Sequence, residues 1–289
     1  MLEKSKLFAE SWNVAWRKKA PGEILDDLNT EFKVIKNGFR YWAADPFVFE
    51  YNDEVYIFAE LYDYVRCRGT LGYYKLRGKK SGRWKPVIIE NHHLSYPNVF
   101  RNGNDIFIMP EANASNELYL YRATKFPDKW EKCQVLRSDV NYADTTMFEW
   151  NGKQNALTYK ITDPYCPELL LLDLQNADND RKLQLPIVER RRPAGNVFQY
   201  HGKRIRPAQD CEDDYGKGII FYEYEMTSDG EYRENEVLEV KPDQMVLSHR
   251  LYLDGMHTYN CSKNYEVIDI KTRRFNLLNF VFRFLGKIF

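Results

Sequence analysis

The sequence predicts an all-β protein, a single five-bladed β-propeller, from three observations. A strand–turn–strand pattern recurs with a period near fifty residues, aromatic residues make up 15% of the chain, and most repeats contain further apolar segments for outer strands. Aromatic rings pack well on pleated sheets, and four strands per repeat arranged radially are typical of propellers. We therefore expect one β-sheet, or blade, for each repeat.

The first two repeats share one register. The segment Ala44–Glu60 reads as a strand, an Asn-Asp turn and a second strand, and Ser95–Glu111 repeats this pattern around an Asn-Gly turn. Asp45 lies 15 residues before the end of the first segment, and Tyr96 lies 15 residues before the end of the second. Asn-Gly and Asn-Asp between apolar runs favour tight hairpins, because the turn residues need positive φ.

Three further units fit the pattern, and the five units begin near residues 45, 96, 144, 194 and 257. Alternating segments that suit third strands follow four of them: 71–76, 117–122, 169–174 and 218–224. The fifth unit lacks an outer strand, and the N-terminal segment 7–16 is predicted to supply one and close the ring, because an open edge strand invites unwanted pairing. The competing interpretation is a two-sheet sandwich, which five in-phase repeats disfavour.

The predicted organisation is a propeller over residues 1–274 followed by a basic amphipathic tail, 275–289, expected to contain a short helix. This tail is too short to span a bilayer, and it is predicted either to contact a membrane interface or to dock on the propeller. No other window approaches the ~18 apolar residues of a membrane span, and the N-terminus lacks the apolar run of a signal peptide. We expect a cytoplasmic protein, peripheral to the inner face of the membrane if the tail binds lipid.

Charge and cysteine content exclude several function classes. Lys+Arg and Asp+Glu both number 42, whereas a nucleic-acid-binding protein would carry a basic excess. The five cysteines are scattered, and no two form a C-x-x-C pair, which disfavours both a disulfide framework and a zinc site. The sequence predicts no metal motif and no cofactor.

The candidate site lies where the first strands of the blades begin, because these strands line the channel of a propeller. The equivalent positions are Asp45, Tyr96, Asp144, Ala194 and His257. The second strands end at Glu60, at Glu111, at Tyr159 with Lys160, and at Gln209 with Asp210. Carboxylates held close together acquire different pKa values, so one can act as a base and another as an acid.

Each of these residues also has a structural interpretation. Asp45 precedes a proline and suits a turn, the two glutamates suit solvated strand ends, and His257 alone favours a structural role. His93 suits either binding of sugar hydroxyls or capping of the next strand. Arg206 lies in the middle of a strand, and because an unpaired arginine in the core is costly, we expect it in the channel beside Asp210.

Several motifs together resemble a known family. The segment Ala44-Asp45-Pro46-Phe47 in a five-bladed frame is similar to glycoside hydrolase family 43. Nearly the whole chain resembles the N-terminal domain of glucosamine inositolphosphorylceramide transferases and its stand-alone bacterial relatives. The shared stretches are 44–47, 93–97, 110–111, 206–211 with 215–216, 257–258 and 267–269.

The resemblance implies roles for some of these residues. In family 43 hydrolases an aspartate of the first blade is the general base, an aspartate of the third tunes pKa, and a glutamate of the fourth is the general acid. Asp45 and Asp144 match the first two. The segment Arg192–Asn196 carries no carboxylate, so hydrolysis would require Glu111 or Asp210 as a replacement.

The leading hypothesis is a carbohydrate-active enzyme that transfers a sugar during assembly of a cell-envelope polysaccharide or glycolipid. Its partners would be a sugar donor and a glycan or glycolipid acceptor. The predicted catalytic residues are Asp45, Asp144 and Glu111, and the predicted substrate-binding residues are Glu60, His93, Tyr96, Arg206, Asp210 and His257. Two alternatives stay open: a glycoside hydrolase of the family 43 type and a non-catalytic glycan-binding module.

Overall fold

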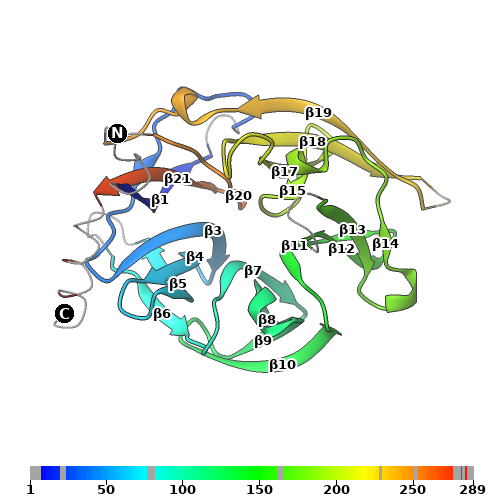
Figure 1. The fold of residues 1–289 in the computed structure, drawn as a ribbon, viewed down its shortest axis with the longest axis horizontal. Helices are drawn as coiled ribbons and strands as arrows, with labels where there is room; N and C mark the ends of the chain where they lie inside the picture. Colours follow the sequence, from blue (N-terminus) through cyan, green and yellow to red (C-terminus); the bar gives the residue numbers. More distant parts are fainter. Residues whose placement is uncertain are drawn as a thin grey trace.

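The computed structural model describes residues 8–19, 24–76, 82–161, 166–227, 230–249 and 253–275, together with Val281 and Phe284. Five antiparallel sheets are arranged around a central axis, with the starts of their first strands toward the middle (Figure 1). The predicted five-bladed propeller is confirmed. We number the blades 1 to 5 in the order of their first strands.

The first three blades each contain four consecutive strands, ordered from the axis outward. Blade 1 comprises β3 (Tyr41–Tyr51), β4 (Glu54–Asp63), β5 (Arg68–Leu76) and β6 (Lys85–Ile88). Blade 2 comprises β7 (Ser95–Asn102), β8 (Asp105–Glu111), β9 (Glu117–Lys125) and β10 (Lys129–Ser138). Blade 3 comprises β11 (Tyr142–Trp150), β12 (Lys153–Lys160), β13 (Glu168–Asp173) and β14 (Arg181–Lys182).

Blade 4 differs because its innermost strand is interrupted. It comprises β15 (Arg192–Pro193), β16 (Phe198–Tyr200), β17 (Lys203–Asp210), β18 (Gly218–Met226) and β19 (Tyr232–Val240). Both β15 and β16 pair with β17, so four residues bulge out of the ladder between them. Short 3-10 helices lie in loops at Asn113–Ser115, Ala177–Asn179, Val188–Arg190 and Pro242–Gln244.

Hairpin turns join the first and second strands as the sequence predicts. Both central residues have positive φ in the Asn52-Asp53 turn (49° and 61°), in Asn151-Gly152 (49° and 75°) and in His201-Gly202 (47° and 79°). Such turns match the right-handed twist of the strands that they connect. The turn chemistry therefore sets the register that brings the other ends of these strands to the centre.

Both ends of the described chain contribute to blade 5, which consists of β20 (Tyr259–Cys261), β21 (Tyr265–Phe275), β1 (Phe8–Lys18) and β2 (Lys33–Val34). β1 pairs with β21 without a break, from Phe8 opposite Phe275 to Lys18 opposite Tyr265. The prediction that an N-terminal strand closes the ring is confirmed.

A buried ion pair stabilises this closure. The Glu266 carboxylate of β21 accepts hydrogen bonds from Arg17 Nε of β1 at 2.6 Å, from the Ile24 amide at 2.7 Å and from the Tyr259 hydroxyl at 2.7 Å. The Arg17 and Glu266 side chains are both buried. One carboxylate therefore joins three segments of blade 5.

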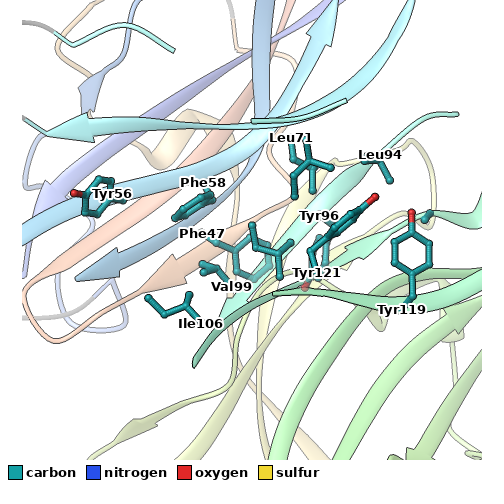
Figure 2. Packing of buried hydrophobic residues seen from close by; sticks show 13 residues of the cluster. Phe47, Tyr56, Phe58, Leu71, Leu94, Tyr96, Val99, Ile106, Tyr119 and Tyr121 are labelled. Carbon is teal, nitrogen blue, oxygen red and sulfur yellow. The ribbon is translucent and has the colours of Figure 1, made fainter. Parts of the chain in front are cut away.

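The hydrophobic core lies between adjacent blades, because alternate residues of each strand point to opposite faces of its sheet. Between blades 1 and 2, Phe47 and Phe58 lie in one buried cluster with Tyr96 and Val99 (Figure 2). The Phe47 and Tyr96 rings meet edge to face with centroids 4.9 Å apart. The Tyr96 hydroxyl extends to Thr146 of blade 3 at 2.6 Å, so packing holds Tyr96 against both neighbours.

Most of the predicted C-terminal tail lies outside the described residues. Of positions 276–289, only Val281 and Phe284 are described, and both are helical and exposed. Within the part of the chain that the structure describes, no helix is long and apolar enough to cross a membrane.

Candidate active site

Three first strands carry a β-bulge at the same position, and the bulged residue faces the centre. The ladder skips two residues of the inner strand between Ala44 and Phe47, and the corresponding skips occur in β7 and β11. Asp45, Tyr96 and Asp144 occupy these bulges with φ of 51°, 45° and 50°. A bulge redirects a side chain and removes its amide from the ladder.

Acidic side chains accept hydrogen bonds from the amides that the bulges release. The Asp45 amide donates to Asp269 at 3.0 Å, the Tyr96 amide to Asp45 at 3.1 Å and the Asp144 amide to Glu111 at 3.1 Å. In each case the acceptor belongs to the preceding blade in the ring. These hydrogen bonds offset the free-energy cost of the left-handed backbone conformation, about 1–3 kcal/mol per residue. They also link each blade to its neighbour.

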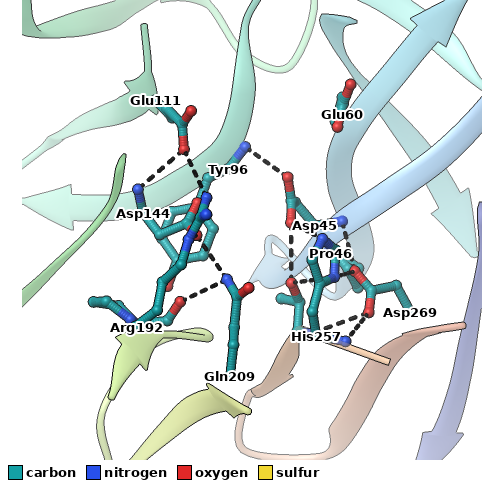
Figure 3. Close-up of polar contacts among 12 residues, drawn as sticks. Asp45, Pro46, Glu60, Tyr96, Glu111, Asp144, Arg192, Gln209, His257 and Asp269 are labelled. Atoms are coloured by element: carbon teal, nitrogen blue, oxygen red, sulfur yellow. Dashed lines mark hydrogen bonds and ion pairs between the residues drawn. The ribbon is translucent and has the colours of Figure 1, made fainter. Parts of the chain in front are cut away.

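On one side of the centre, Asp269, His257 and Asp45 form a buried chain of contacts (Figure 3). His257 Nδ1 lies 2.6 Å from Asp269 Oδ2, and His257 Nε2 lies 3.5 Å from Asp45 Oδ1. Thr258 Oγ1 donates to the same Asp45 oxygen at 3.0 Å. The Trp12 ring stacks on the His257 imidazole with centroids 4.0 Å apart, which fixes the plane of the imidazole.

The pKa values of Asp45 and His257 are raised for different reasons. Burial, opposed by the charge of His257, raises the pKa of Asp45 to about 7, and the negative charges of Asp144 and Glu60 add to this. Burial disfavours the imidazolium, but the Asp269 and Asp45 carboxylates outweigh it and raise the pKa of His257 to about 9. At neutral pH the imidazole is therefore charged, and Asp45 is poised to gain or lose a proton.

The same trio brings three potential metal ligands together, with one atom from each of Asp45, His257 and Asp269 within 4.8 Å of the others. Hydrogen bonds already occupy these atoms. Asp269 accepts four N–H groups, namely the amides of Asp45, His257 and Thr258 and the His257 Nδ1–H. Because a saturated carboxylate has little capacity left for a cation, we treat the trio as a hydrogen-bonded unit.

On the other side of the centre, Asp144 is held by two donors. Arg192 Nε and Gln209 Nε2 both lie 2.6 Å from Asp144 Oδ2, and Figure 3 shows them converging beside Glu111. Burial, followed by the charge of Asp144, raises the pKa of Glu111 well above its usual range, which favours the protonated acid. This side thus combines a carboxylate paired with arginine and a carboxyl group whose raised pKa favours the protonated form.

Glu60 and His93 lie at the edge of this centre, beside Asp45. His93 Nε2 is 3.2 Å from Glu60 Oε1, and His93 Nδ1 accepts the Gly69 amide at 3.0 Å. A Cβ atom at position 69 would lie 2.4 Å from the Leu94 carbonyl oxygen and 2.5 Å from Glu60 Oε1, so the close approach of the backbone requires glycine here. The Glu60 side chain is buried and that of His93 is half-exposed.

Comparison with known proteins identifies the family. The family described as glucosamine inositolphosphorylceramide transferase 1, N-terminal, matches residues 9–164, more than half of the 289 residues. The chain belongs to this family. Glucosamine inositolphosphorylceramide transferase 1 of Oryza sativa subsp. indica is 30% identical over 206 residues, which cover 67% of this chain and 27% of the rice protein. The Arabidopsis thaliana protein of the same name is 31% identical over 209 residues, or 68% and 27% of the two chains.

The chain therefore spans only about a quarter of the length of these curated relatives. Solved structures add support for the fold. A family 43 β-xylosidase/α-arabinofuranosidase from a compost microbial metagenome has a TM-score of 0.55 at 10% identity, covering 83% of this chain and 94% of its own. A family 43 enzyme from Xanthomonas citri has the same TM-score and identity, covering 81% and 87%.

In this member of the glucosamine inositolphosphorylceramide transferase N-terminal family, most of the predicted site residues meet at the centre. They are Asp45, Glu60, His93, Tyr96, Glu111, Asp144 and His257, and they form the contacts described above. Their catalytic and binding roles stay predictions.

The expected position of Arg206 beside Asp210 in the channel was wrong. Arg206 Nε and Nη2 form a bidentate pair with Glu234 of β19, at 2.7 and 2.8 Å. Asp210 instead accepts the Glu212 amide at 3.2 Å. Successive residues of a strand face opposite sides, and Gln209, not Asp210, points to the Asp144 cluster. Arg206 is thus a buried structural residue of blade 4.

Sequence reasoning overlooked two residues at the centre of the site. Asp269 is part of a stretch shared with the family, but its position in the second strand of blade 5 gave no sign of its four hydrogen bonds. Arg192 lies two residues before Ala194, the position expected to line the channel. Ala194 is fully buried and pairs through its backbone with Pro207 and Tyr259, so Arg192 contributes the side chain of this blade.

Asp269→Asn is expected to lower the pKa of His257 from about 9 toward its usual value near 6.5, because the imidazolium loses its nearest negative charge. Histidine NMR titration measures this directly. In the wild type, the stability that His257 contributes is present below pH 6.5 and is lost as pH rises through about 9. Asp213→Asn, an exposed control, should leave the titration unchanged. An unchanged pKa of His257 in Asp269→Asn would contradict the assigned role of Asp269.

Proposed function

We propose that this chain is a carbohydrate-active enzyme that transfers a sugar in the assembly of a cell-envelope polysaccharide or glycolipid. The observation that carries the proposal is the state of Asp45. This buried carboxyl group has a pKa of about 7 and is oriented by the Tyr96 amide, Thr258 and His257. A general base works best when its pKa lies near the working pH. The names of the curated relatives, which are transferases, agree with this proposal.

In the proposed reaction, Asp45 takes the proton of an acceptor hydroxyl. The acceptor oxygen forms a bond to the anomeric carbon of the donor, and the bond between that carbon and the leaving group breaks. Asp144 is not assigned as the base, because Arg192 Nε and Gln209 Nε2 already donate hydrogen bonds to its Oδ2 at 2.6 Å. The raised pKa of Glu111 favours its protonated form, which can donate a proton to the leaving group or hydrogen-bond the sugar.

A second candidate function is hydrolysis of a glycoside, which the protonated state of Glu111 favours. Asp45 would then activate water, and Glu111 would replace the acid that the fourth blade lacks. Hydrolysis releases a free sugar without an activated donor, whereas transfer requires the donor. The two reactions are therefore distinguished by their products.

The test is incubation of the wild-type chain with a panel of nucleotide sugars and glycolipid acceptors, analysed by mass spectrometry. Donor-dependent mass gain of the acceptor supports transfer. Sugar released from p-nitrophenyl glycosides without a donor supports hydrolysis and overturns transfer. Glycan binding without turnover of any substrate identifies a binding module and overturns both reactions.

Glu111→Gln is expected to lower the transfer rate by roughly 10²-fold, the usual contribution of an acid–base group. Glutamine still accepts the Asp144 amide, so the fold should survive, but it cannot release a proton. Measurement of kcat at several pH values checks this, with Glu117→Gln, which changes a partly exposed glutamate paired with Lys132, as the matched control. An unchanged rate in Glu111→Gln would remove Glu111 from the mechanism.

A further inference from the structure

Arg192 is a cation at the centre of the acidic site with most of its donors unused. Its Nε donates to Asp144 at 2.6 Å, while its Nη2 lies 3.7 Å from Glu111, beyond hydrogen-bond range. Within the part of the chain that the structure describes, neither terminal nitrogen donates a hydrogen bond. The side chain is only 13% exposed. The terminal nitrogens of this nearly buried guanidinium are thus available to hydrogen-bond a ligand.

Aromatic rings position this guanidinium. Arg192 Cζ lies 5.6 Å from the centroid of the Tyr159 ring and 5.4 Å from that of Tyr215. Tyr215 is partly exposed and also contacts the His257 ring edge to face, with centroids 5.1 Å apart. Two rings and one carboxylate thus fix the planar fork before any ligand arrives, so little conformational entropy is lost on binding.

The charges around Arg192 are compatible with an anion despite the many acids. Asp144 is neutralised by Arg192 itself, and Asp269 is matched by His257. Glu111 favours its protonated form because of its burial. Glu60 lies 3.2 Å from His93 Nε2, and Asp45 lies 3.5 Å from His257 Nε2. The approaching anion therefore meets carboxyl groups that each have an arginine or histidine partner.

Other buried cations among the described residues are already committed. Arg206 forms the bidentate pair with Glu234, and Lys271 contacts Glu10, Asp214 and the Tyr215 carbonyl. Arg17 donates to Glu266 and to the Thr30 carbonyl, although its buried Nη2 has no partner among the described residues. Arg192 differs from them because its free nitrogens lie beside the proposed catalytic carboxyl groups.

We propose that Arg192 binds a phosphoryl group of the substrate, so that the site takes a phosphorylated sugar or polyol in preference to a neutral glycan. The planar guanidinium matches phosphate oxygens in a bidentate geometry. This inference rests on the proposed function of the same site. The phosphoryl group belongs either to the diphosphate of a sugar donor or to a phosphodiester of the acceptor, and both present the same chemistry to Arg192.

The test is isothermal titration calorimetry of the full chain with two phosphorylated probes and their neutral counterparts. UDP-N-acetylglucosamine represents a donor, glycerophosphoinositol represents an acceptor, and N-acetylglucosamine and myo-inositol are the neutral controls. We expect the wild type to bind at least one phosphorylated probe more tightly than its neutral counterpart. Arg192→Gln should weaken that binding by roughly 10- to 100-fold and leave the neutral probes unaffected, and the probe that responds identifies the source of the phosphoryl group.

Two further variants separate this inference from the function on which it rests. Arg192→Lys keeps the charge without the fork and should bind the responding probe with intermediate affinity, which also provides a result if Arg192→Gln fails to fold. Asp45→Asn should retain phosphate-dependent binding, because it removes only the proposed base. Equal binding of phosphorylated and neutral probes by the wild type, or unchanged affinity in both Arg192 variants, overturns the inference even if sugar transfer is observed. Phosphate-dependent binding without turnover supports the inference and refutes the proposed enzyme.

Discussion

Asp45→Asn is expected to reduce sugar transfer by about 10³-fold, within the range that a positioned general base contributes. Asparagine keeps an oxygen that can accept the Tyr96 amide or the Thr258 hydroxyl, which contact Asp45 at 3.1 and 3.0 Å. It cannot take a proton from the acceptor. The loss should therefore appear in kcat, measured with saturating donor and acceptor, while KM changes little.

The pH dependence of the wild type tests the same assignment. The groups that face Asp45 are His257, Asp144, Glu60 and Asp269, and together with burial they set its pKa to about 7. The base acts in its deprotonated form, so kcat/KM should rise with pH through about 7. This rise should be absent from the residual activity of Asp45→Asn.

As pH rises through about 7, kcat/KM should increase, whereas the stability that Asp45 contributes should decrease. Because the pKa of Asp45 in the folded chain lies above its usual value near 3.8, folding favours the neutral acid. Its stabilising contribution is complete below that usual value and is lost as pH rises through about 7. Compared with the wild type, Asp45→Asn should melt at a relatively higher temperature at pH 8 than at pH 5.

The control for both measurements is Asp53→Asn in the exposed β3–β4 turn, where asparagine tolerates the positive φ of 61°. This variant should retain wild-type activity and pH dependence. Full activity of Asp45→Asn would remove Asp45 as the base and with it the main support for an enzymatic function.

The parts of the fold that could be predicted from sequence rest on local chemistry. Turn residues such as Asn52 and Asn151 require positive φ, and a fixed spacing from each turn places Ala44 opposite Glu60 and Ser95 opposite Glu111. A period of two then decides which side chains face the channel. The central positions of Asp45, Tyr96 and Asp144 follow from this repetition.

The parts of the site that could not be predicted depend on partners distant in the chain. Asp269 accepts a hydrogen bond from the Asp45 amide, 224 residues away in the chain, and no local sequence pattern predicts that contact. In blade 4 the interrupted inner strand shifts the channel-facing position from Ala194 to Arg192, so counting by analogy with the other blades fails. Arg206 pairs with Glu234 on an outer strand, 28 residues away in the chain. The alternation of side chains along a strand does not by itself identify that partner.

Glu266→Gln is expected to destabilise the propeller by about 3–5 kcal/mol, the usual effect of removing one member of a buried ion pair. Arg17 would keep its charge in a buried position without a counterion, and the weaker amide would replace a carboxylate that accepts hydrogen bonds from Arg17, Ile24 and Tyr259. The loss should appear as a lower urea midpoint in equilibrium unfolding. Because Glu266 joins β21 to β1, the closure of the ring should be the first part of the structure to weaken, seen as faster amide exchange in β1.

The matched control for Glu266→Gln is Glu131→Gln. Glu131 pairs with Arg122 at 2.6 Å, the same separation as between Arg17 and Glu266. The side chains of Arg122 and Glu131, however, are both about half exposed. Solvent screens such a pair, so the expected cost is only about 0–1 kcal/mol. Equal losses in the two variants would mean that burial of the Glu266 pair adds nothing. In that case the continuous ladder between β1 and β21, rather than the ion pair, would hold the two ends of the propeller together.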